Sequence, residues 1–277
     1  MTSTFLPQFL SGRHAFVAGG TSGINLAIAR GLARHGARVS VLSRNAERVA
    51  AAVATLQGEG PGAGGHVGDV RDLAAMQRAM DAAHAAFGPL DIVVAGAAGN
   101  FICPVSELSS NGFKAVMDID LLGTFHTYRA AYPFLRRPGA SLLTISAPQS
   151  TEAYWGQAHV SAAKAGVDML TKSLAVEWGE EGIRVNGIVP GPIEGTEGVA
   201  RLAPTPGIRA AWEQANPMRR MGTGEDVANV ALFLCSDAAS YVSGTIVYCD
   251  GGQVLGGARD YREAWRAMRA ATGGAQG

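Results

Sequence analysis

The chain has few cysteines and no net charge, and each of these features excludes a class of protein. It also has only three lysines, Lys114, Lys164 and Lys172. Its three cysteines, Cys103, Cys235 and Cys249, are an odd number without metal-ligand spacing. This predicts reduced thiols in a reducing compartment and no metal site. The 23 basic and 23 acidic side chains cancel. Without a dense basic block, this balance argues against a nucleic-acid partner.

Long apolar runs are also missing. No stretch of the 277 residues reaches the roughly 18 to 20 apolar residues that a membrane span needs. The opening residues lack the basic and apolar regions of a signal peptide. We therefore predict a cytoplasmic protein that has no membrane partner.

Short apolar runs alternate with segments of helical period from residue 15 onward. Near-continuously apolar strands separated by helices are typical of a parallel sheet covered on both faces. The sequence therefore predicts an α/β fold, a single doubly wound Rossmann domain with three αβα layers. Strands are expected near residues 15–18, 38–42, 66–70, 91–95, 141–146, 184–189 and 246–249, and helices near 24–34, 46–57, 73–87, 111–135, 157–178 and 224–234.

We expect one domain over residues 1–277, with a core over about 11–257 and a tail over about 258–277. Residues 191–222 break the alternation, because they hold four prolines and five glycines without a clear strand. A long insertion after the carboxyl end of a strand is well placed to cover a ligand. We name residues 191–222 the substrate loop.

A glycine-rich turn, residues 19–25 with the sequence Gly-Gly-Thr-Ser-Gly-Ile-Asn, joins the first strand to the first helix. Glycines let backbone N–H groups approach a pyrophosphate, whose charge the helix N-terminus favours. A purely structural turn is the alternative interpretation. The predicted phosphate-binding residues are Gly19, Thr21, Ser22, Gly23 and Ile24.

The second strand ends in Ser43-Arg44-Asn45, where an NAD-binding protein usually carries Asp or Glu for the ribose 2′-hydroxyl. A guanidinium binds a 2′-phosphate through two charge-assisted hydrogen bonds, whereas a carboxylate repels it. Arg44 therefore predicts NADP(H) as the cofactor. A solvated surface arginine is the alternative interpretation.

Further motifs follow in order, and together with the glycine turn they resemble the short-chain dehydrogenase/reductase family over about residues 11–257. These are Gly68-Asp69-Val70, Ala95-Gly96-Ala97-Ala98-Gly99, Lys164, Arg184-Val185-Asn186, Pro190-Gly191-Pro192-Ile193 and Asp250-Gly251-Gly252. The resemblance implies a Rossmann fold and a nicotinamide cofactor. It also implies adenosine contacts from Asp69, Val70 and Ala97, nicotinamide-ribose contacts from Lys164, and cofactor contacts from Pro190, Gly191 and Ile193.

Three positions depart from the family pattern. The tyrosine usually found four residues before the lysine is Val160, the carbonyl-polarising serine is Ala147, and the last glycine of the turn is Asn25. Valine cannot donate a proton and alanine cannot polarise a carbonyl, so ordinary ketone reduction lacks both its acid and its hydrogen-bond donor.

One subgroup of the family lacks this tyrosine, the 2,4-dienoyl-CoA reductases, and the sequence is most similar to their peroxisomal type. The similar stretches are residues 97–101, 113–120, 123–125, 174–179 and 191–198, with His159. The resemblance implies that NADPH reduces a conjugated dienoyl thioester while a held water supplies the proton. It implies that Asp120 and Lys164 are the catalytic residues. Asp120 either orients the water as a carboxylate, which we favour, or donates the proton itself, which would require burial to raise its pKa. A capping carboxylate and a surface lysine are the structural alternatives for these two.

An acyl-CoA-like substrate would contact Asn100, Phe101, His159 and Arg220, with core packing as the alternative for Phe101 and His159. Because such a substrate carries phosphates, Arg201, Arg209 and Arg219 are further cations to consider at the pocket mouth.

Two other functions stay open: a reductase for another carbonyl or alcohol that uses Ser146, Tyr154 or His159, and a silent NADP-binding protein. The family resemblance also implies a homotetramer paired through helices 111–135 and 157–178.

Overall fold

A seven-stranded parallel sheet forms the centre of the computed structural model, which describes residues 4–256. Its strands are β1 (His14–Ala18), β2 (Arg38–Ser43), β3 (Ala63–Val67), β4 (Ile92–Ala95), β5 (Ser141–Ile145), β6 (Arg184–Pro190) and β7 (Ile246–Cys249). The strand order is β3-β2-β1-β4-β5-β6-β7. The order reverses between β1 and β4, which makes the carboxyl edge of this pair the place where such folds bind ligands.

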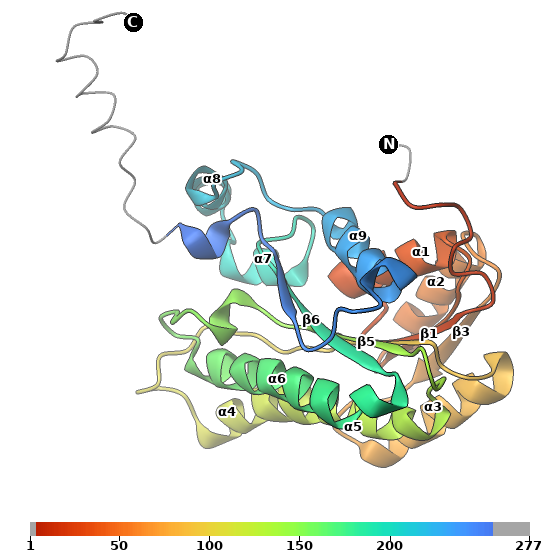
Figure 1. The fold of residues 1–277 in the computed structure, drawn as a ribbon. Coiled ribbons are helices and arrows are strands. Elements are labelled where there is room, and N and C mark those ends of the chain that lie inside the picture. The colour runs from red at the N-terminus through yellow and green to blue at the C-terminus, as the bar shows by residue number, and fades with distance from the viewer. Residues whose placement is uncertain (1–3, 257–277) are drawn as a thin grey trace, which may run out of the picture.

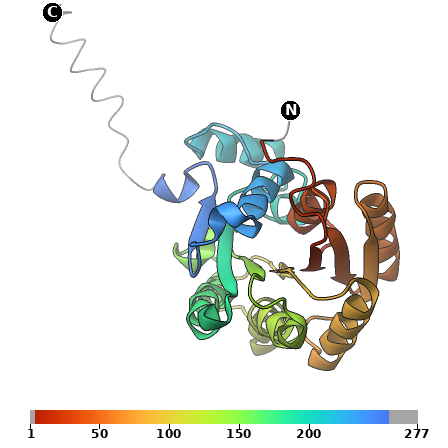
Figure 2. The same ribbon diagram turned by 45° about the vertical axis from the view of Figure 1, so that its right-hand side comes forward.

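Helices cover both faces of the sheet (Figures 1 and 2). On one face lie α1 (Gly23–Arg34), α2 (Ala46–Gln57) and α9 (Gly224–Cys235), and on the other lie α3 (Leu73–Phe87), α4 (Ser110–Val116), α5 (Gly123–Ala131) and α6 (Ala158–Glu177). The predicted doubly wound fold is therefore confirmed. Within residues 4–256, every helix is too short or too polar to cross a membrane.

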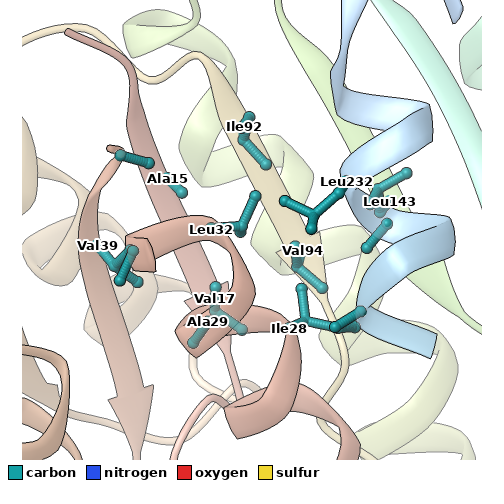
Figure 3. Packing of buried hydrophobic residues seen from close by; sticks show 14 of the residues in the cluster. Ala15, Val17, Ile28, Ala29, Leu32, Val39, Ile92, Val94, Leu143 and Leu232 are labelled. Carbon is teal, nitrogen blue, oxygen red and sulfur yellow. The ribbon is translucent and has the colours of Figure 1, made fainter. Parts of the chain in front are cut away.

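The core is divided by the sheet because strand side chains alternate between its faces. In β1, Ala15 and Val17 pack against α1 and α9, whereas Phe16 and Ala18 face the α3, α5 and α6 layer. Figure 3 shows the first of these clusters, where Leu32 of α1 meets side chains of the strands. Both clusters are nearly inaccessible to water, so the strands are held rigidly up to their carboxyl ends.

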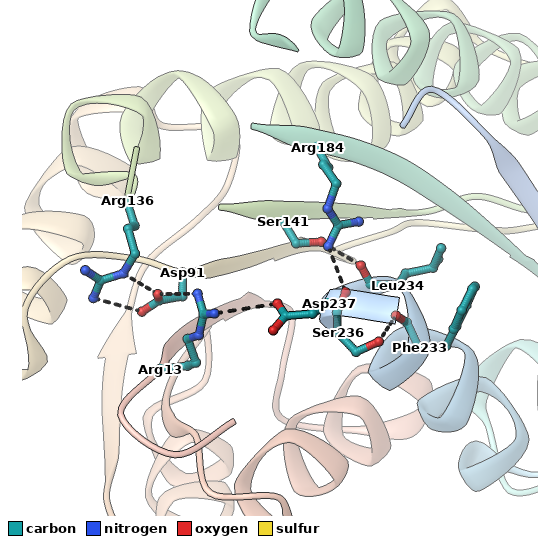
Figure 4. A network of polar contacts seen from close by, with 9 residues as sticks. All are labelled: Arg13, Asp91, Arg136, Ser141, Arg184, Phe233, Leu234, Ser236 and Asp237. Carbon is teal, nitrogen blue, oxygen red and sulfur yellow. Dashed lines mark hydrogen bonds and ion pairs between the residues drawn. The ribbon is translucent and has the colours of Figure 1, made fainter. Parts of the chain in front are cut away.

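Charged side chains concentrate at the amino ends of the strands (Figure 4). The Asp91 carboxylate, 1% exposed, accepts hydrogen bonds from the His14 backbone N–H at 2.9 Å and from Arg13 at 3.2 Å, and it also binds Arg136. A cavity of about 420 Å³ lies there, lined by Arg13 and Asp91. This cavity lies at the opposite edge of the sheet from the switch point, and Arg13 and Asp91 are already paired with each other. We therefore assign these charged groups to fold stability and not to ligand binding.

Two predicted elements differ from the structure. The third strand spans Ala63–Val67 rather than 66–70. A Cβ at Gly65 would lie 2.5 Å from Val49 of α2, so the glycines that weaken the strand signal are what lets α2 pack there. The helix expected at 111–135 is interrupted by a π-helical turn, Met117–Leu122, between α4 and α5.

The substrate loop contains helices that the sequence did not predict. Within residues 191–222 lie α7 (Glu197–Leu202) and α8 (Pro206–Ala215), each begun by a threonine side chain that accepts a backbone N–H. Thr196 and Thr205 are the two caps. The tail predicted over 258–277 lies outside the described residues.

Candidate active site

A cavity of about 840 Å³ opens at the carboxyl edge of the sheet, beneath the substrate loop. Every residue that the sequence predicted to hold the cofactor lines it, and so do both predicted catalytic residues. Most of the cofactor residues come together because their motifs follow the carboxyl ends of parallel strands, whereas Asp120 comes from the turn at Met117–Leu122 and Lys164 from α6. The lining includes Gly19, Thr21, Ser22, Gly23, Ile24, Arg44, Asp69, Val70, Ala97, Asp120, Lys164, Pro190, Gly191 and Ile193.

The glycine turn after β1 is shaped for a close approach. Gly19 has a φ of +76°, and a Cβ there would lie 3.0 Å from the Ala97 backbone after β4. Ser22, the N-cap of α1, makes no side-chain cap hydrogen bond, and the first turn of α1 carries no acidic residue. The N-terminus of this helix can therefore accept an anion.

Asn25, which replaces the usual glycine, links the start of α1 to the turn after β4. Its carboxamide Nδ2 donates to the Gly96 carbonyl at 2.7 Å, and a Cβ at Gly96 would collide with it. Its Oδ1 is buried and has no hydrogen-bond partner among the described residues. The same holds for buried oxygens of three other residues that line the cavity, namely Asn100, Ser146 and Gln253. Such orphaned polar atoms fit a site built to hold a polar ligand.

Basic and acidic side chains meet where β2 and β3 end. Arg44 is exposed at the cavity wall, and Asp69 pairs with Arg71 at 2.5 Å. The Arg71 guanidinium holds the pKa of the Asp69 carboxyl below its usual range, and the charge of Arg44 adds to the effect. This end of the cavity therefore offers both an acceptor for a base or ribose and a cation for a phosphate.

Asp120 and Lys164 form a buried ion pair in the cavity. Asp120 Oδ2 lies 3.2 Å from Lys164 Nζ, with side-chain exposures of 0% and 7%. The other carboxylate oxygen accepts the Gly99 N–H at 2.7 Å, and Lys164 also donates to the Ile145 carbonyl at 2.9 Å. The π-helical turn carries Asp120, in keeping with the frequent use of such turns at functional sites.

The position of the missing tyrosine is filled by packing. Val160 is 2% exposed and forms a small apolar cluster with Val116 and Ala163. Ala147 lines the cavity without a hydroxyl. No acid takes the place of the phenol at these two positions.

The three side chains considered for a rearranged site differ in what they already bind. The Tyr154 hydroxyl donates to Glu152 at 3.0 Å and accepts from Gln253 at 3.2 Å, and burial together with Glu152 raises the Tyr154 pKa to about 12. His159 does not line the cavity; its Nε2 lies 3.1 Å from the Phe101 carbonyl oxygen. Ser146 lines the cavity, and its hydroxyl has no partner among the described residues.

The predicted substrate residues are not all brought together. Asn100 lines the cavity, but Phe101, His159 and Arg220 do not. The Phe101 and His159 rings pack 4.3 Å apart, and Arg220 pairs with Asp226 at 2.9 Å.

The other arginines of the substrate loop also differ. Arg201 lines the cavity and donates to the Asn100 carbonyl at 3.1 Å. Arg209 donates to the Ala203 carbonyl at 2.9 Å, and Arg219 to the Gln214 carbonyl.

Sequence reasoning missed several lining residues. Gln149 and Gln157 are nearly buried, and their carboxamides meet at 3.4 Å; Trp155, Trp212 and Asn216 line the same cavity. None of them belongs to a motif quoted above, and only a fold that brings the substrate loop over the strand ends reveals them.

Comparisons with known proteins agree with this geometry. Residues 18–253 match a family model described as "Enoyl-(Acyl carrier protein) reductase". An Arabidopsis thaliana protein named "Peroxisomal 2,4-dienoyl-CoA reductase", of the (3E)-enoyl-CoA-producing kind, is 41% identical over 262 residues, 91% of this chain and 88% of that protein. A Bacillus subtilis (strain 168) protein named "Probable 2,4-dienoyl-CoA reductase", of the (2E)-enoyl-CoA-producing kind, is 42% identical over 243 residues, 86% of this chain and 95% of that protein.

Solved structures are similar as well. A short chain dehydrogenase from Bacillus anthracis has a TM-score of 0.78 at 36% identity, covering 87% of this chain and 96% of that one. Levodione reductase has a TM-score of 0.84 at 30% identity, covering 88% and 98%. The chain therefore belongs to the short-chain dehydrogenase/reductase family and is an oxidoreductase of that family.

Proposed function

We propose that this oxidoreductase uses NADPH to reduce a 2,4-dienoyl thioester of coenzyme A. The observation that carries the proposal is the buried Asp120–Lys164 pair in a cavity where Val160 fills the place of the tyrosine. A conjugated thioester needs no phenol, because its own carbonyl takes up the electron pair. The names of the relatives quoted above support this substrate class.

The reaction balances with one proton from solvent. When bound, NADPH supplies a hydride to the far carbon of the diene, and the electron pair moves through the chain to the thioester oxygen. A water molecule then gives a proton to carbon, so a dienoyl thioester, NADPH and a proton become an enoyl thioester and NADP⁺. Asp120 orients that water as a carboxylate, and the water regains its proton from solvent.

Lys164 holds the cofactor and supports Asp120. Of its three N–H donors, one is used by the Ile145 carbonyl and one points to Asp120, which leaves one for the ribose hydroxyls of the nicotinamide. Gly99 N–H fixes the Asp120 carboxylate from the other side at 2.7 Å. Both groups are thus held in place before substrate arrives, which favours catalysis by positioning.

Arg44 supports NADPH over NADH. It follows β2 at the cavity wall, where a guanidinium suits a 2′-phosphate, and the charge of Asp69 nearby is already balanced by Arg71. The thirteen predicted cofactor residues are therefore assigned to NADP(H). Of the predicted substrate residues, Asn100 lines the cavity and is kept as a substrate contact. Arg201, which also lines the cavity and donates to the Asn100 carbonyl, is added as a cation for the substrate phosphates.

A homotetramer is part of the proposal. Phe113, Leu122 and Phe125 expose 38–43% of their surface on the α4–α5 segment, and Met169 and Val176 of α6 expose 60% and 81%. Exposed apolar side chains on the α4–α5 segment and on α6 are suited to contact the same helices of a second copy of the chain. Light scattering of the purified chain tests the tetramer. A cytoplasmic location stays a prediction.

The activity is tested by mixing the protein with NADPH and a 2,4-dienoyl-CoA and following the loss of NADPH absorbance. We expect turnover by the wild-type chain. Asp120→Ala should abolish it while NADPH binding, followed by fluorescence, is retained. Turnover of simple ketones but not of the dienoyl thioester would refute the proposal, and tight NADPH binding with no turnover would favour a silent binding protein.

A further inference from the structure

Ser146 is a fixed residue beside the lysine of the site. It directly follows β5, and its backbone N–H donates to the Ile188 carbonyl of β6 at 2.8 Å. The carbonyl of the preceding residue, Ile145, accepts the hydrogen bond from Lys164 Nζ at 2.9 Å. Backbone bonds on both sides therefore hold Ser146 at the lysine end of the cavity, which it lines.

The hydroxyl of this serine is unused. Ser146 is 4% exposed, and its Oγ has no hydrogen-bond partner among the described residues. A buried hydroxyl without a partner destabilises a fold, so an orphaned one calls for an explanation. Tyr154 already binds Glu152 and Gln253, and His159 lies outside the lining. Among the three residues considered for a rearranged site, Ser146 alone combines a free donor with a place in the cavity wall.

The reaction proposed above assigns no hydrogen-bond donor to the thioester oxygen. Negative charge builds on the thioester oxygen when hydride reaches the diene, and the two residues that would bind a carbonyl oxygen in the family pattern are Val160 and Ala147. Lys164 is paired with Asp120, so its charge is largely balanced within the site. A neutral donor next to the lysine would meet this need.

We propose that the Ser146 hydroxyl donates a hydrogen bond to the thioester oxygen and stabilises the charge that develops there. This inference rests on the proposed function. The hydroxyl keeps its proton throughout, so no bond to hydrogen is broken at Ser146 and the overall balance of the reaction is unchanged.

A catalytic role and a packing role of the Ser146 side chain predict opposite effects of Ser146→Ala on the melting temperature and on kcat. Because the hydroxyl has no hydrogen-bond partner within residues 4–256, Ser146→Ala should leave the melting temperature unchanged or raise it. The same change should lower kcat by about 10²- to 10³-fold, the usual effect of losing one oxyanion donor. Ser146→Thr keeps the hydroxyl and should restore most of the rate.

Ser150 provides a matched control. Its Oγ is also buried and without a partner among the described residues, it lies on the same segment, and it does not line the cavity. Ser150→Ala should therefore change neither kcat nor NADPH affinity.

The experiment measures kcat, NADPH affinity and melting temperature for wild type, Ser146→Ala, Ser146→Thr and Ser150→Ala. It adds the absorbance spectrum of a dienoyl-CoA bound with NADP⁺, which allows no forward reduction. A hydrogen bond to the thioester oxygen polarises the conjugated chain and moves its absorbance to longer wavelength. We expect that shift in all proteins except Ser146→Ala.

Two results would overturn the assignment while leaving the proposed function intact. One is a Ser146→Ala enzyme with kcat within twofold of wild type and the full spectral shift. The other is weaker NADPH binding in Ser146→Ala with the spectral shift retained, which would make Ser146 a cofactor contact. A wild-type chain that neither reduces nor spectrally shifts the dienoyl-CoA would remove both proposals together.

Discussion

Removing both charges of the buried Asp120–Lys164 pair should cost less stability than the two single removals added together. The two groups are 3.2 Å apart and almost completely shielded from water. At an effective dielectric constant of roughly 20, their attraction is about 5 kcal/mol. Leaving one buried charge without its partner typically costs about 3–5 kcal/mol in the free energy of unfolding.

Asp120→Asn isolates the charge effect, because the carboxamide oxygen can still accept the Gly99 N–H. We expect Asp120→Asn and Lys164→Met each to lower the free energy of unfolding by about 3–5 kcal/mol. The double variant buries no charge at this place, so its loss should fall short of the sum of the two by at least about 2 kcal/mol.

Urea unfolding of the four proteins at neutral pH measures this coupling. Each protein is followed by circular dichroism and tryptophan fluorescence so that two-state behaviour can be checked. Single losses under about 1 kcal/mol, or strictly additive losses, would refute the reasoning by showing that water screens the pair.

Three further changes test other parts of the structure. Arg44→Asp should weaken NADPH binding by about thirtyfold, equivalent to about 2 kcal/mol, and spare NADH, as titration of each cofactor would reveal; equal losses for both would remove the 2′-phosphate role. Burial lowers the pKa values of His14 and His66 in the folded chain, so on acidification the unfolded chain binds protons at a higher pH than the folded chain does. The contribution of the two neutral histidines to the free energy of unfolding should be fully present above pH about 6.5 and decrease below it. A urea midpoint that stays constant between pH 7 and 5 would contradict this. Gly96→Ala should cost about 1–3 kcal/mol of stability by collision with the Asn25 carboxamide, and adding Asn25→Ala should recover part of it; an unchanged melting temperature would show that the turn can shift.

The fold and the nucleotide end of the site could be predicted because they depend on local sequence. Apolar strands, helical period and glycine position are readable within short windows, and the parallel arrangement then brings the segments after β1 and β4 together. Gly19 and Ala97 illustrate this: 78 positions apart in the numbering, they meet so closely that a Cβ on Gly19 would touch the Ala97 backbone.

The substrate end was harder to predict because it depends on how helices sit over the strand ends. Within 111–135, periodicity does not distinguish an α-helix from one that contains a π-helical turn, yet that turn carries Asp120. Side-chain direction was also out of reach: Arg220 turns to Asp226, and His159 to the Phe101 carbonyl. The proline- and glycine-rich loop hid α7 and α8, whose threonine caps are weak signals next to the helix-breaking residues.

The substitution at Val160 changes what the lysine does. Beside a tyrosine, an ammonium can lower the pKa of the phenol and so help it to give up a proton; here Lys164 faces the carboxylate of Asp120 and a backbone carbonyl instead. The pair is close to neutral as a unit, so it can position a water and a ribose but lends little positive charge to an oxyanion. Val160 packs against Val116 and Ala163, so an apolar side chain occupies the place of the missing acid. In the proposed reaction the proton therefore comes from a water that Asp120 orients, and the proposed Ser146 hydroxyl supplies the separate neutral donor that the thioester oxygen needs.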